Sequence, residues 1–189
     1  MKFRQATMDD IDLLADWRWE VSAWIHEKGS DQWDITGLSR EEFERRITRS
    51  IKAGETWLAL DDNDRPVGTI AIDVVGDEGL WADEELGESY VIHRMMVPRA
   101  YSGRGVGVAM MKFAEDLARS HGRRKLVLDA WNTNKELHSY YESFGFRRVR
   151  TVSNHWTPSA TLFEKLVPNF DPTAKGPDKT PIQFRDQGR

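Results

Sequence analysis

Cysteine is absent from the 189 residues, and other features that mark special classes of protein are scarce. Without a thiol the chain forms no disulfide, offers no thiolate nucleophile and supplies no cysteine ligand to a metal. No apolar run approaches the roughly 20 residues that a membrane-spanning helix needs. No apolar stretch follows Met1-Lys2-Phe3-Arg4-Gln5 either, so we expect no secretory signal and no membrane partner.

An excess of positive charge is also missing. The 27 Lys+Arg face 31 Asp+Glu, and the net charge of −4 argues against nucleic acid as a partner. With 39% hydrophobic and 31% charged residues, the length suits one soluble domain, expected to be cytoplasmic. We expect that domain over residues 1–167 and a polar C-terminal tail over 168–189, where four of the seven prolines fall.

Apolar periodicity predicts helices and strands in alternation, the pattern of an α/β protein. The expected helices run from Thr7 to before Gly29, from a Ser39 cap to Gly54, from Gly105 to His121, and from a Thr133 cap to Gly145. The expected strands are 3–6, 56–60, 67–74, 89–97, 125–131, 147–153 and 159–167. A polar turn joins the second and third strands into an antiparallel hairpin. The acidic stretch 75–88 is expected to be a loop.

A glycine cluster, Ser102-Gly103-Arg104-Gly105-Val106-Gly107, lies between an expected strand and an expected helix. Glycine lets the backbone approach a ligand closely, and the helix start offers unpaired N–H groups and partial positive charge. The cluster therefore suits a phosphate or pyrophosphate, with Arg104 adding a formal charge. Taken alone, it is equally compatible with a plain glycine-rich turn.

Two other phosphate-binding schemes compete for this cluster. A P-loop is excluded because Val108-Ala109 follow the last glycine in place of Lys and Ser or Thr. A dinucleotide site stays open: the G-x-G-x-G spacing departs from its fingerprint, but Asp129 ends the next strand, where a ribose-binding carboxylate would lie.

Two motifs resemble those of the GNAT N-acetyltransferase superfamily. Residues 97–107 resemble its acyl-CoA loop, with the glycines in place and Ser102 where the family usually has Arg or Gln. Residues 134–146 resemble its next motif, with Asn134, Tyr141-Glu142 and Gly145-Phe146 matching and Leu137 replacing the usual small residue. The resemblance is strong over 89–147 and extends over roughly 1–167.

The resemblance implies the GNAT fold, a mixed central sheet of about seven strands with four flanking helices. Acetyl-CoA, as co-substrate, would lie in a V-shaped cleft where the parallel strands 89–97 and 125–131 splay apart. Pantetheine would pair with the backbone of the first of these strands, and the pyrophosphate would lie on the amides of 103–108. The residues implied to bind it are Met95, Met96, Val97, Ser102, Gly103, Arg104, Gly105, Val106, Gly107, Val108, Asn134 and Tyr141.

The implied reaction is direct transfer to an amine, with no metal; the five histidines show no metal-ligand spacing. Tyr141 matches the family's tyrosine that faces the departing sulfur, where a phenol can donate a hydrogen bond or a proton. The alternative is a tyrosine packed on the helix face with its hydroxyl bonded elsewhere. Tyr140 is adjacent but points elsewhere on the helix, so it is the natural internal control. Asn134 either contacts CoA or caps its helix.

The residues that serve the acceptor are less defined. Glu88, His93 and Asp129 are candidates for the proton acceptor, although a lone His in a buried strand is also compatible with a core role. The resemblance implies acceptor contacts from Trp24, His26, Gln32, Trp33 and Trp81. Trp24 and Trp33 equally suit the core under the first helix.

The resemblance implies acetylation of a primary amine. We expect the amine to belong to a small molecule, because bulky aromatic side chains in the first helices would narrow an open peptide groove. Two alternatives stay open: acetylation of a protein or peptide N-terminus or lysine, and a non-catalytic acyl-CoA-binding protein. A homodimer is compatible with the sequence.

Overall fold

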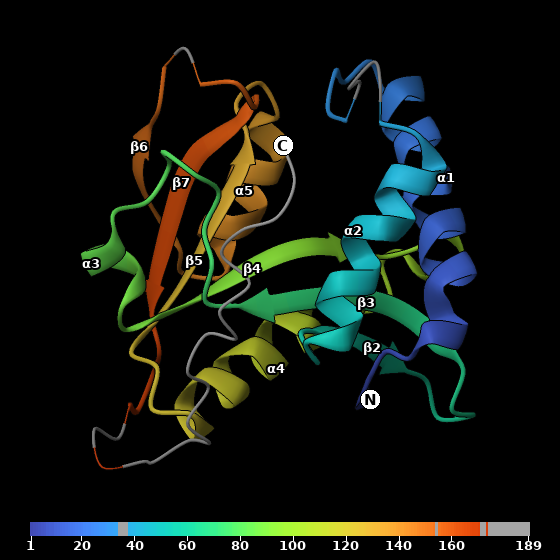
Figure 1. Ribbon diagram of the computed structural model, residues 1–189, viewed down its shortest axis with the longest axis horizontal. Coiled ribbons are helices and arrows are strands. Elements are labelled where there is room, and N and C mark those ends of the chain that lie inside the picture. Colours follow the sequence, from blue (N-terminus) through green and yellow to red (C-terminus); the bar gives the residue numbers. More distant parts are fainter. Residues whose placement is uncertain (34–37, 154, 171–172, 174–189) are drawn as a thin grey trace.

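The computed structural model contains a seven-stranded sheet in the order β1-β2-β3-β4-β5-β7-β6 (Figure 1). It describes residues 1–33, 38–153, 155–170 and 173. The strands are β1 (Lys2–Gln5), β2 (Thr56–Leu60), β3 (Pro66–Asp73), β4 (Ser89–Met96), β5 (Lys125–Trp131), β6 (Arg147–Thr151) and β7 (Ser159–Leu166). The helices are α1 (Ile11–Glu27), α2 (Arg40–Lys52), α3 (Asp83–Leu86), α4 (Val106–Ser120) and α5 (Lys135–Ser143), with 3₁₀ turns η1 (Met8–Asp10) and η2 (Arg99–Tyr101). Among the described residues, no helix is long and apolar enough to cross a membrane.

The parallel pair β4 and β5 is the feature that shapes the site. The two strands are joined through α4 and pair over three positions, from Ser89↔Lys125 to Val91↔Val127. Beyond this point in the described sheet, β4 pairs with β3 and β5 pairs with β7. Figure 1 shows the two strands diverging from there. The predicted mixed sheet with splayed parallel strands is confirmed.

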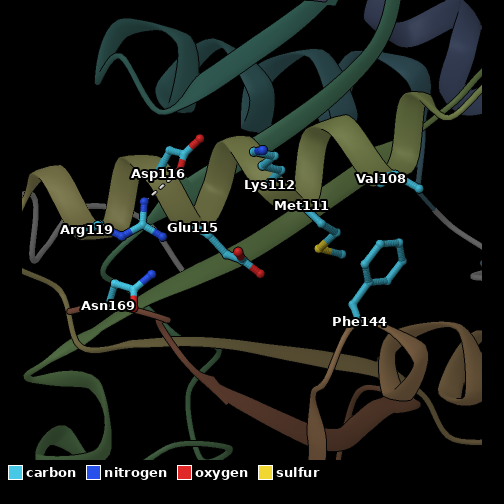
Figure 2. A pocket seen from close by; sticks show the side chains of 8 residues that line it. All are labelled: Val108, Met111, Lys112, Glu115, Asp116, Arg119, Phe144 and Asn169. Atoms are coloured by element: carbon cyan, nitrogen blue, oxygen red, sulfur yellow. Dashed lines mark hydrogen bonds and ion pairs between the residues drawn. The ribbon is translucent and has the colours of Figure 1, made fainter.

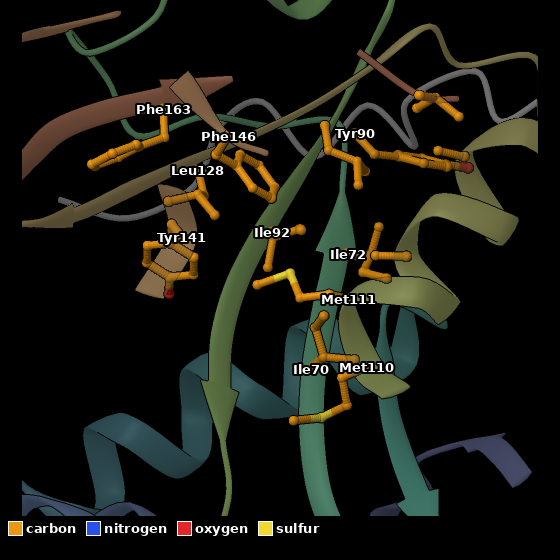
Figure 3. Close-up of a cluster of buried hydrophobic side chains, with 14 of the residues drawn as sticks. Ile70, Ile72, Tyr90, Ile92, Met110, Met111, Leu128, Tyr141, Phe146 and Phe163 are labelled. Atoms are coloured by element: carbon orange, nitrogen blue, oxygen red, sulfur yellow. The ribbon is translucent and has the colours of Figure 1, made fainter. Parts of the chain in front are cut away.

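Apolar clusters cover the two faces of this sheet. On one face Ile72 and Ile92 pack with Met110 and Met111 of α4, and Tyr141 and Phe146 extend the cluster beneath α5 (Figure 3). On the other face, α1 and α2 pack their apolar residues against β2 and the end of β4. Because side chains alternate along a strand, Asp73 and His93, which follow Ile72 and Ile92, lie on the face that carries α1 and α2.

Two local expectations need correction. The stretch 75–88 is not entirely loop, because Asp83-Glu84-Glu85-Leu86 form α3, whose first turn is stabilised by Glu85 accepting a hydrogen bond from Ala82 N at 2.8 Å. The cap of α5 is Asn134, not Thr133: Asn134 Oδ1 accepts from Leu137 N at 2.9 Å. The tail predicted over 168–189 lies outside the described residues except for 168–170 and 173.

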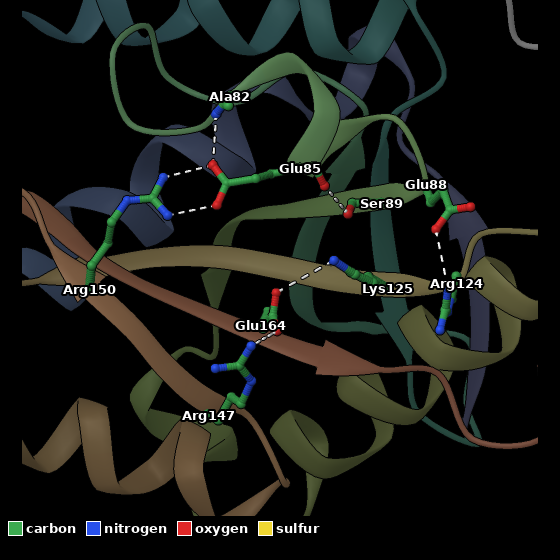
Figure 4. Close-up of polar contacts among 9 residues, drawn as sticks. All are labelled: Ala82, Glu85, Glu88, Ser89, Arg124, Lys125, Arg147, Arg150 and Glu164. Carbon is green, nitrogen blue, oxygen red and sulfur yellow. Dashed lines mark hydrogen bonds and ion pairs between the residues drawn. The ribbon is translucent and has the colours of Figure 1, made fainter.

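A partly buried ion pair attaches α3 to β6 (Figure 4). Both carboxylate oxygens of Glu85 accept hydrogen bonds from Arg150, at 2.6 and 2.7 Å, and Arg150 also donates to Leu80 O at 2.7 Å. The Arg150 hydrogen bond lowers the pKa of Glu85 to about 2, and the Ala82 amide adds to the effect. The pair therefore fixes the 75–88 segment against the sheet.

Replacing Glu85 with Gln is expected to lower the melting temperature at pH 7 by about 2–4 °C, the equivalent of about 1 kcal/mol for a pair partly open to solvent. Because folding lowers the pKa of Glu85, its contribution is present above the ordinary value of 4.5 and is lost as the pH falls toward 2. Denaturant unfolding from pH 7 to pH 3 measures this. Glu84→Gln on the same helix is the matched control; an E85Q deficit that does not shrink with falling pH would exclude the ion pair as its cause.

Candidate active site

The turn between η2 and α4 presents backbone amides at the end of β4. Gly103 and Gly105 have φ of +73° and +77°, and Gly105 is the N-cap of α4. Only glycine adopts such φ values without strain, which explains both residues. The first helical hydrogen bond runs from Ala109 N to Gly105 O at 3.0 Å, so the N–H groups of Val106, Gly107 and Val108 have no helical acceptor. The turn therefore fits an anion, as its sequence predicts.

The side chains of this turn point outward. Ser102 and Arg104 are exposed, and the Arg104 guanidinium lies 5.7 Å from the Tyr101 ring centroid. The Ser102 amide donates to Arg99 O at 3.1 Å and so belongs to η2. Contact between Arg104 and a diphosphate stays a prediction.

The position of Tyr140 on its helix predicts a side chain that points away from the site, but the structure places its hydroxyl close to α4. A methyl group built at Gly107 would overlap the Tyr140 hydroxyl, while Tyr140 Cζ lies 3.4 Å from that methyl position. The phenol therefore lies against Gly107 in the first turn of α4, the turn whose amides suit an anion. Tyr140 is unsuitable as a control for Tyr141.

Tyr141 lies on the buried face of α5 and is 8% exposed, with its ring 6.0 Å from both Phe146 and Phe163. Figure 3 shows its hydroxyl on the side of the ring turned away from those two rings. Burial, with smaller contributions from the negative charge of Asp129 and from Tyr140, raises the pKa of Tyr141 above its usual value. The phenol is therefore protonated at neutral pH and can donate.

The edge of β4 that faces the opening V is formed by its last residues and Val97. Met96 packs into the α1–α2 cluster, whereas Met95 and Val97 pack against the cluster beneath α4. Arg94 has φ of +46° at a register shift between β3 and β4. Such a bulge bends a strand and turns its edge, which adds to the divergence from β5. The pairs of β4 with β5 end at Val91, and pairing of the backbone of Met95–Val97 with a ligand stays a prediction.

Polar side chains meet on the α1–α2 face of the splayed strands. His93 Nε2 lies 3.2 Å from Asp73 Oδ1 and 3.0 Å from Val75 O, and both of these atoms are acceptors. Nε2 therefore carries the hydrogen, and Nδ1 of the neutral ring holds the lone pair. Burial lowers the pKa of His93, but the charge and hydrogen bond of Asp73 outweigh it, so the net shift is upward.

The two other candidate acids differ in position. Asp129 of β5 accepts a hydrogen bond from Ser159 Oγ at 2.5 Å, and burial raises its pKa. Its neighbours Leu128 and Ala130 pack in the cluster with α4, so the Asp129 side chain points to the opposite face of the sheet, the face that carries His93. Glu88 is exposed, 3.7 Å from Arg124, beside the closed end where β4 and β5 pair. The geometry therefore favours His93 and Asp129 over Glu88.

The three candidate acceptor tryptophans lie in different surroundings. The Trp24 ring lies 4.2 Å from the Arg99 guanidinium, and the Trp33 ring lies 4.2 Å from that of Arg18. Trp81 is 8% exposed and packs in an apolar cluster with Leu80 and its neighbours. A guanidinium lies over the Trp81 ring as well, that of Arg150 at 5.5 Å, so all three tryptophans are close to arginine side chains.

The segment after α1 crosses to the start of α5, and we call residues 31–33 the latch. Asp31 Oδ1 accepts from Trp131 Nε1 at 3.0 Å and from Thr133 Oγ1 at 2.5 Å. Asn134 Nδ2 donates to Gln32 Oε1 at 2.5 Å. The Asn134 side chain thus uses its oxygen to cap α5 and its nitrogen to bind Gln32. Its contact with CoA stays a prediction. Sequence reasoning missed Asp31, because its partners lie about a hundred residues away.

A groove of about 570 Å³ runs along α4 away from the amide turn (Figure 2). It is lined by Val108, Met111, Lys112, Glu115, Asp116, Arg119, Phe144 and Asn169. An ion pair of 2.7 Å joins Arg119 to Asp116 at one end, and Phe144 and Val108 form the other. The groove thus begins in the first turn of α4, where the unpaired amides lie.

Comparison with known proteins agrees with this geometry. Residues 14–146 match the Acetyltransferase (GNAT) family. An uncharacterized N-acetyltransferase, YesJ of Bacillus subtilis, is 26% identical over 164 residues, which cover 86% of this chain and 88% of YesJ. A GNAT-family acetyltransferase from Listeria monocytogenes has a TM-score of 0.71 and 26% identity, covering 87% of this chain and 94% of that one. The PaiA N-acetyltransferase of Thermoplasma acidophilum, solved with coenzyme A, has a similar fold, with a TM-score of 0.65, 17% identity and coverage of 87% and 98%.

The fold and the site together define an acyl-CoA-dependent acetyltransferase. The chain belongs to the GNAT family. The dinucleotide alternative is therefore set aside.

Proposed function

We propose that the protein transfers an acetyl group from acetyl-CoA directly to a primary amine of a small molecule, with both substrates bound together. The observation that carries the proposal is the buried phenol of Tyr141 on α5, which packs in the same cluster as Ile92 of β4 and Leu128 of β5. A donor held there can protonate a thiolate as it leaves.

Each part of the site then has a task. The amides at the start of α4 would hold the pyrophosphate, and the backbone edge of Met95–Val97 would hold the pantetheine arm. The groove that starts at Val108 would take the adenosine portion, with Lys112 supplying a positive charge. Acetyl-CoA supplies the thioester that the amine attacks. An amide at the end of β4 would polarise the thioester carbonyl.

The proton released by the amine needs an acceptor, and His93 is the side chain we assign. Its Nε2–H is held by Asp73 and Val75, which leaves Nδ1 with the lone pair. An imidazole oriented by a carboxylate is an effective base near neutral pH. Asp129 would attract the ammonium form of the acceptor into the V.

The latch supports a small acceptor over a peptide. Its hydrogen bonds to Trp131, Thr133 and Asn134 carry the chain across from α1 to α5 on the acceptor side. An extended peptide needs a continuous trough there, whereas a small amine needs only a pocket.

The test is release of free CoA thiol from acetyl-CoA in the presence of a panel of amines. Small primary amines are expected to support turnover and to appear as N-acetyl products by mass spectrometry. Tight binding of CoA with no thiol release from any amine or peptide would instead favour the non-catalytic alternative. Turnover with peptides alone would favour a protein acceptor.

Activity is expected to fall as the pH drops through the raised pKa of His93, because a protonated imidazole accepts no proton. Asp73→Asn should move this acid limb of kcat/KM to lower pH, since the carboxylate that raises the pKa is gone. His93→Gln should remove the limb and lower kcat. His121→Gln, at the far end of α4, is the control. An unchanged limb in H93Q would exclude His93 as the base.

A further inference from the structure

Arg94 adopts a strained backbone conformation beside the proposed site. Its φ is +46°, and of the four non-glycine residues with positive φ in the described ranges it is the one inside a strand. Two residues of β4, Arg94 and Met95, stand opposite the single residue Ile70 of β3. A bulge of this kind usually has glycine at the left-handed position, because glycine has no Cβ to clash. An arginine there costs free energy, which indicates that its side chain has a role that glycine cannot fill.

The Arg94 side chain joins this bulge to α2. Its Nη2 donates a hydrogen bond to Ser50 Oγ at 2.9 Å. Ser50 is 5% exposed, and the same oxygen also accepts from Thr56 Oγ1 of β2 at 2.8 Å. Arg94 lines a narrow cavity with Phe43 and Ile47, two buried residues of α2. The bulge is therefore anchored to a packed helix by a hydrogen bond that is shielded from water, where such bonds are strongest.

The conformation of Arg94 determines the direction of the amide that follows it. The Met95 N–H belongs to the peptide plane next to Arg94, so any change in the backbone torsions of Arg94 rotates that N–H. The pairs of β4 with β5 have already ended at Val91, and the end of β4 is the part that the proposed function places against the thioester. A donor polarises a carbonyl well only when it is held at the correct distance and angle. The anchor of Arg94 therefore acts on the geometry of the reaction.

We propose that Arg94 is a positioning residue for the transfer reaction: its hydrogen bond to Ser50 holds the bulge in its left-handed conformation and so aims the following amide at the thioester carbonyl. The inference rests on the proposed function and adds the side chain that orients the amide donor. Without the anchor, the strained residue relaxes and the amide turns away from the carbonyl. The contact also connects α2 with the strand that would hold the thioester.

Ser50→Ala is the primary test, because it removes the hydrogen-bond acceptor and leaves the charge of Arg94 in place. We expect kcat to fall at least about tenfold, while the KM values for acetyl-CoA and the amine change by less than about twofold.

The second measurement needs no turnover. It is the infrared carbonyl band of bound acetyl-CoA, isotope-labelled at the thioester carbonyl, with no amine present. Hydrogen bonding to the amide should lower the frequency of this band in the wild-type protein, and S50A should return it toward the value of free acetyl-CoA. A change in stability alone would not move the band in this way.

Thr56→Val is the matched control, since it removes the other hydrogen bond to Ser50 Oγ and keeps the bond from Arg94. It should lower the melting temperature and leave kcat and the carbonyl band unchanged. Arg94→Gly separates side chain from backbone: glycine adopts the same φ without strain but has no anchor, so R94G should match S50A in both measurements. Because the charge of Arg94 lowers the pKa of His93, kcat of R94G is measured on the pH plateau above the acid limb.

The outcomes separate this inference from the proposed function. Wild-type kcat and carbonyl band in Arg94→Gly, or equal losses in Ser50→Ala and Thr56→Val, would overturn the inference and leave the proposed function standing. Absence of thiol release with every amine would overturn the proposed function, and the carbonyl band would still decide whether Arg94 orients the amide.

Discussion

Replacing Tyr141 with Phe is expected to lower kcat about a hundredfold while the Kd of CoA changes by less than about twofold. The substitution removes one oxygen from a buried ring whose packing against Phe146 and Phe163 is retained. Pre-steady-state thiol release and calorimetric CoA titration measure the two quantities. A loss in kcat without a loss in affinity is the signature of an interaction made in the transition state.

The control for this variant must also be a buried phenol, and Tyr140 is unsuitable because it lies against Gly107. Tyr90 serves better. It is 3% exposed and its hydroxyl is 2.6 Å from His121 Nδ1, at the opposite end of β4. Tyr90→Phe should cost some stability and leave kcat unchanged. If Y141F were no slower than Y90F, the assignment of Tyr141 as proton donor would be wrong.

The pattern of local signals explains which parts of the fold the sequence predicts well. Ser39 caps α2 by accepting from Glu42 N, as their spacing predicts, and Gly105 adopts the left-handed conformation that ends the glycine turn. These features depend on residues within a few positions of one another. The strand ranges are predicted from apolar periodicity and turn residues. The apolar pattern within a strand indicates whether one or both of its faces are buried.

The features that the sequence does not predict depend on distant partners. Asp31 has no local signal, because its partners Trp131 and Thr133 come from the far side of the sheet. Thr133 has the spacing of a capping box but donates to Asp31 instead, which leaves the cap to Asn134. Arg18 follows the apolar spacing of α1 as a charged residue on its buried face, and only the fold shows that its partners are aromatic rings.

Gly107→Ala is expected to weaken CoA binding by about tenfold or more and to lower the unfolding free energy by about 1–3 kcal/mol. The new methyl group would overlap the Tyr140 hydroxyl, so either the first turn of α4 or the Tyr140 ring must move. Moving the turn displaces the amides of Val106 and Val108 from any anion they hold. Calorimetric titration with CoA and denaturant unfolding measure the two effects.

The double variant Gly107→Ala/Tyr140→Phe tests the steric cause directly. Without the hydroxyl, the nearest atom of residue 140 is the ring carbon 3.4 Å from the methyl position, an ordinary contact, so most of the affinity and stability should return. Gly105→Ala is the matched contrast: nothing lies within 4 Å of its methyl position, and its strain comes from the φ of +77°. Adding Tyr140→Phe should therefore rescue the Gly107→Ala variant and leave the Gly105→Ala variant unimproved. Equal rescue of both, or of neither, would show that Tyr140 does not limit the space beside this turn.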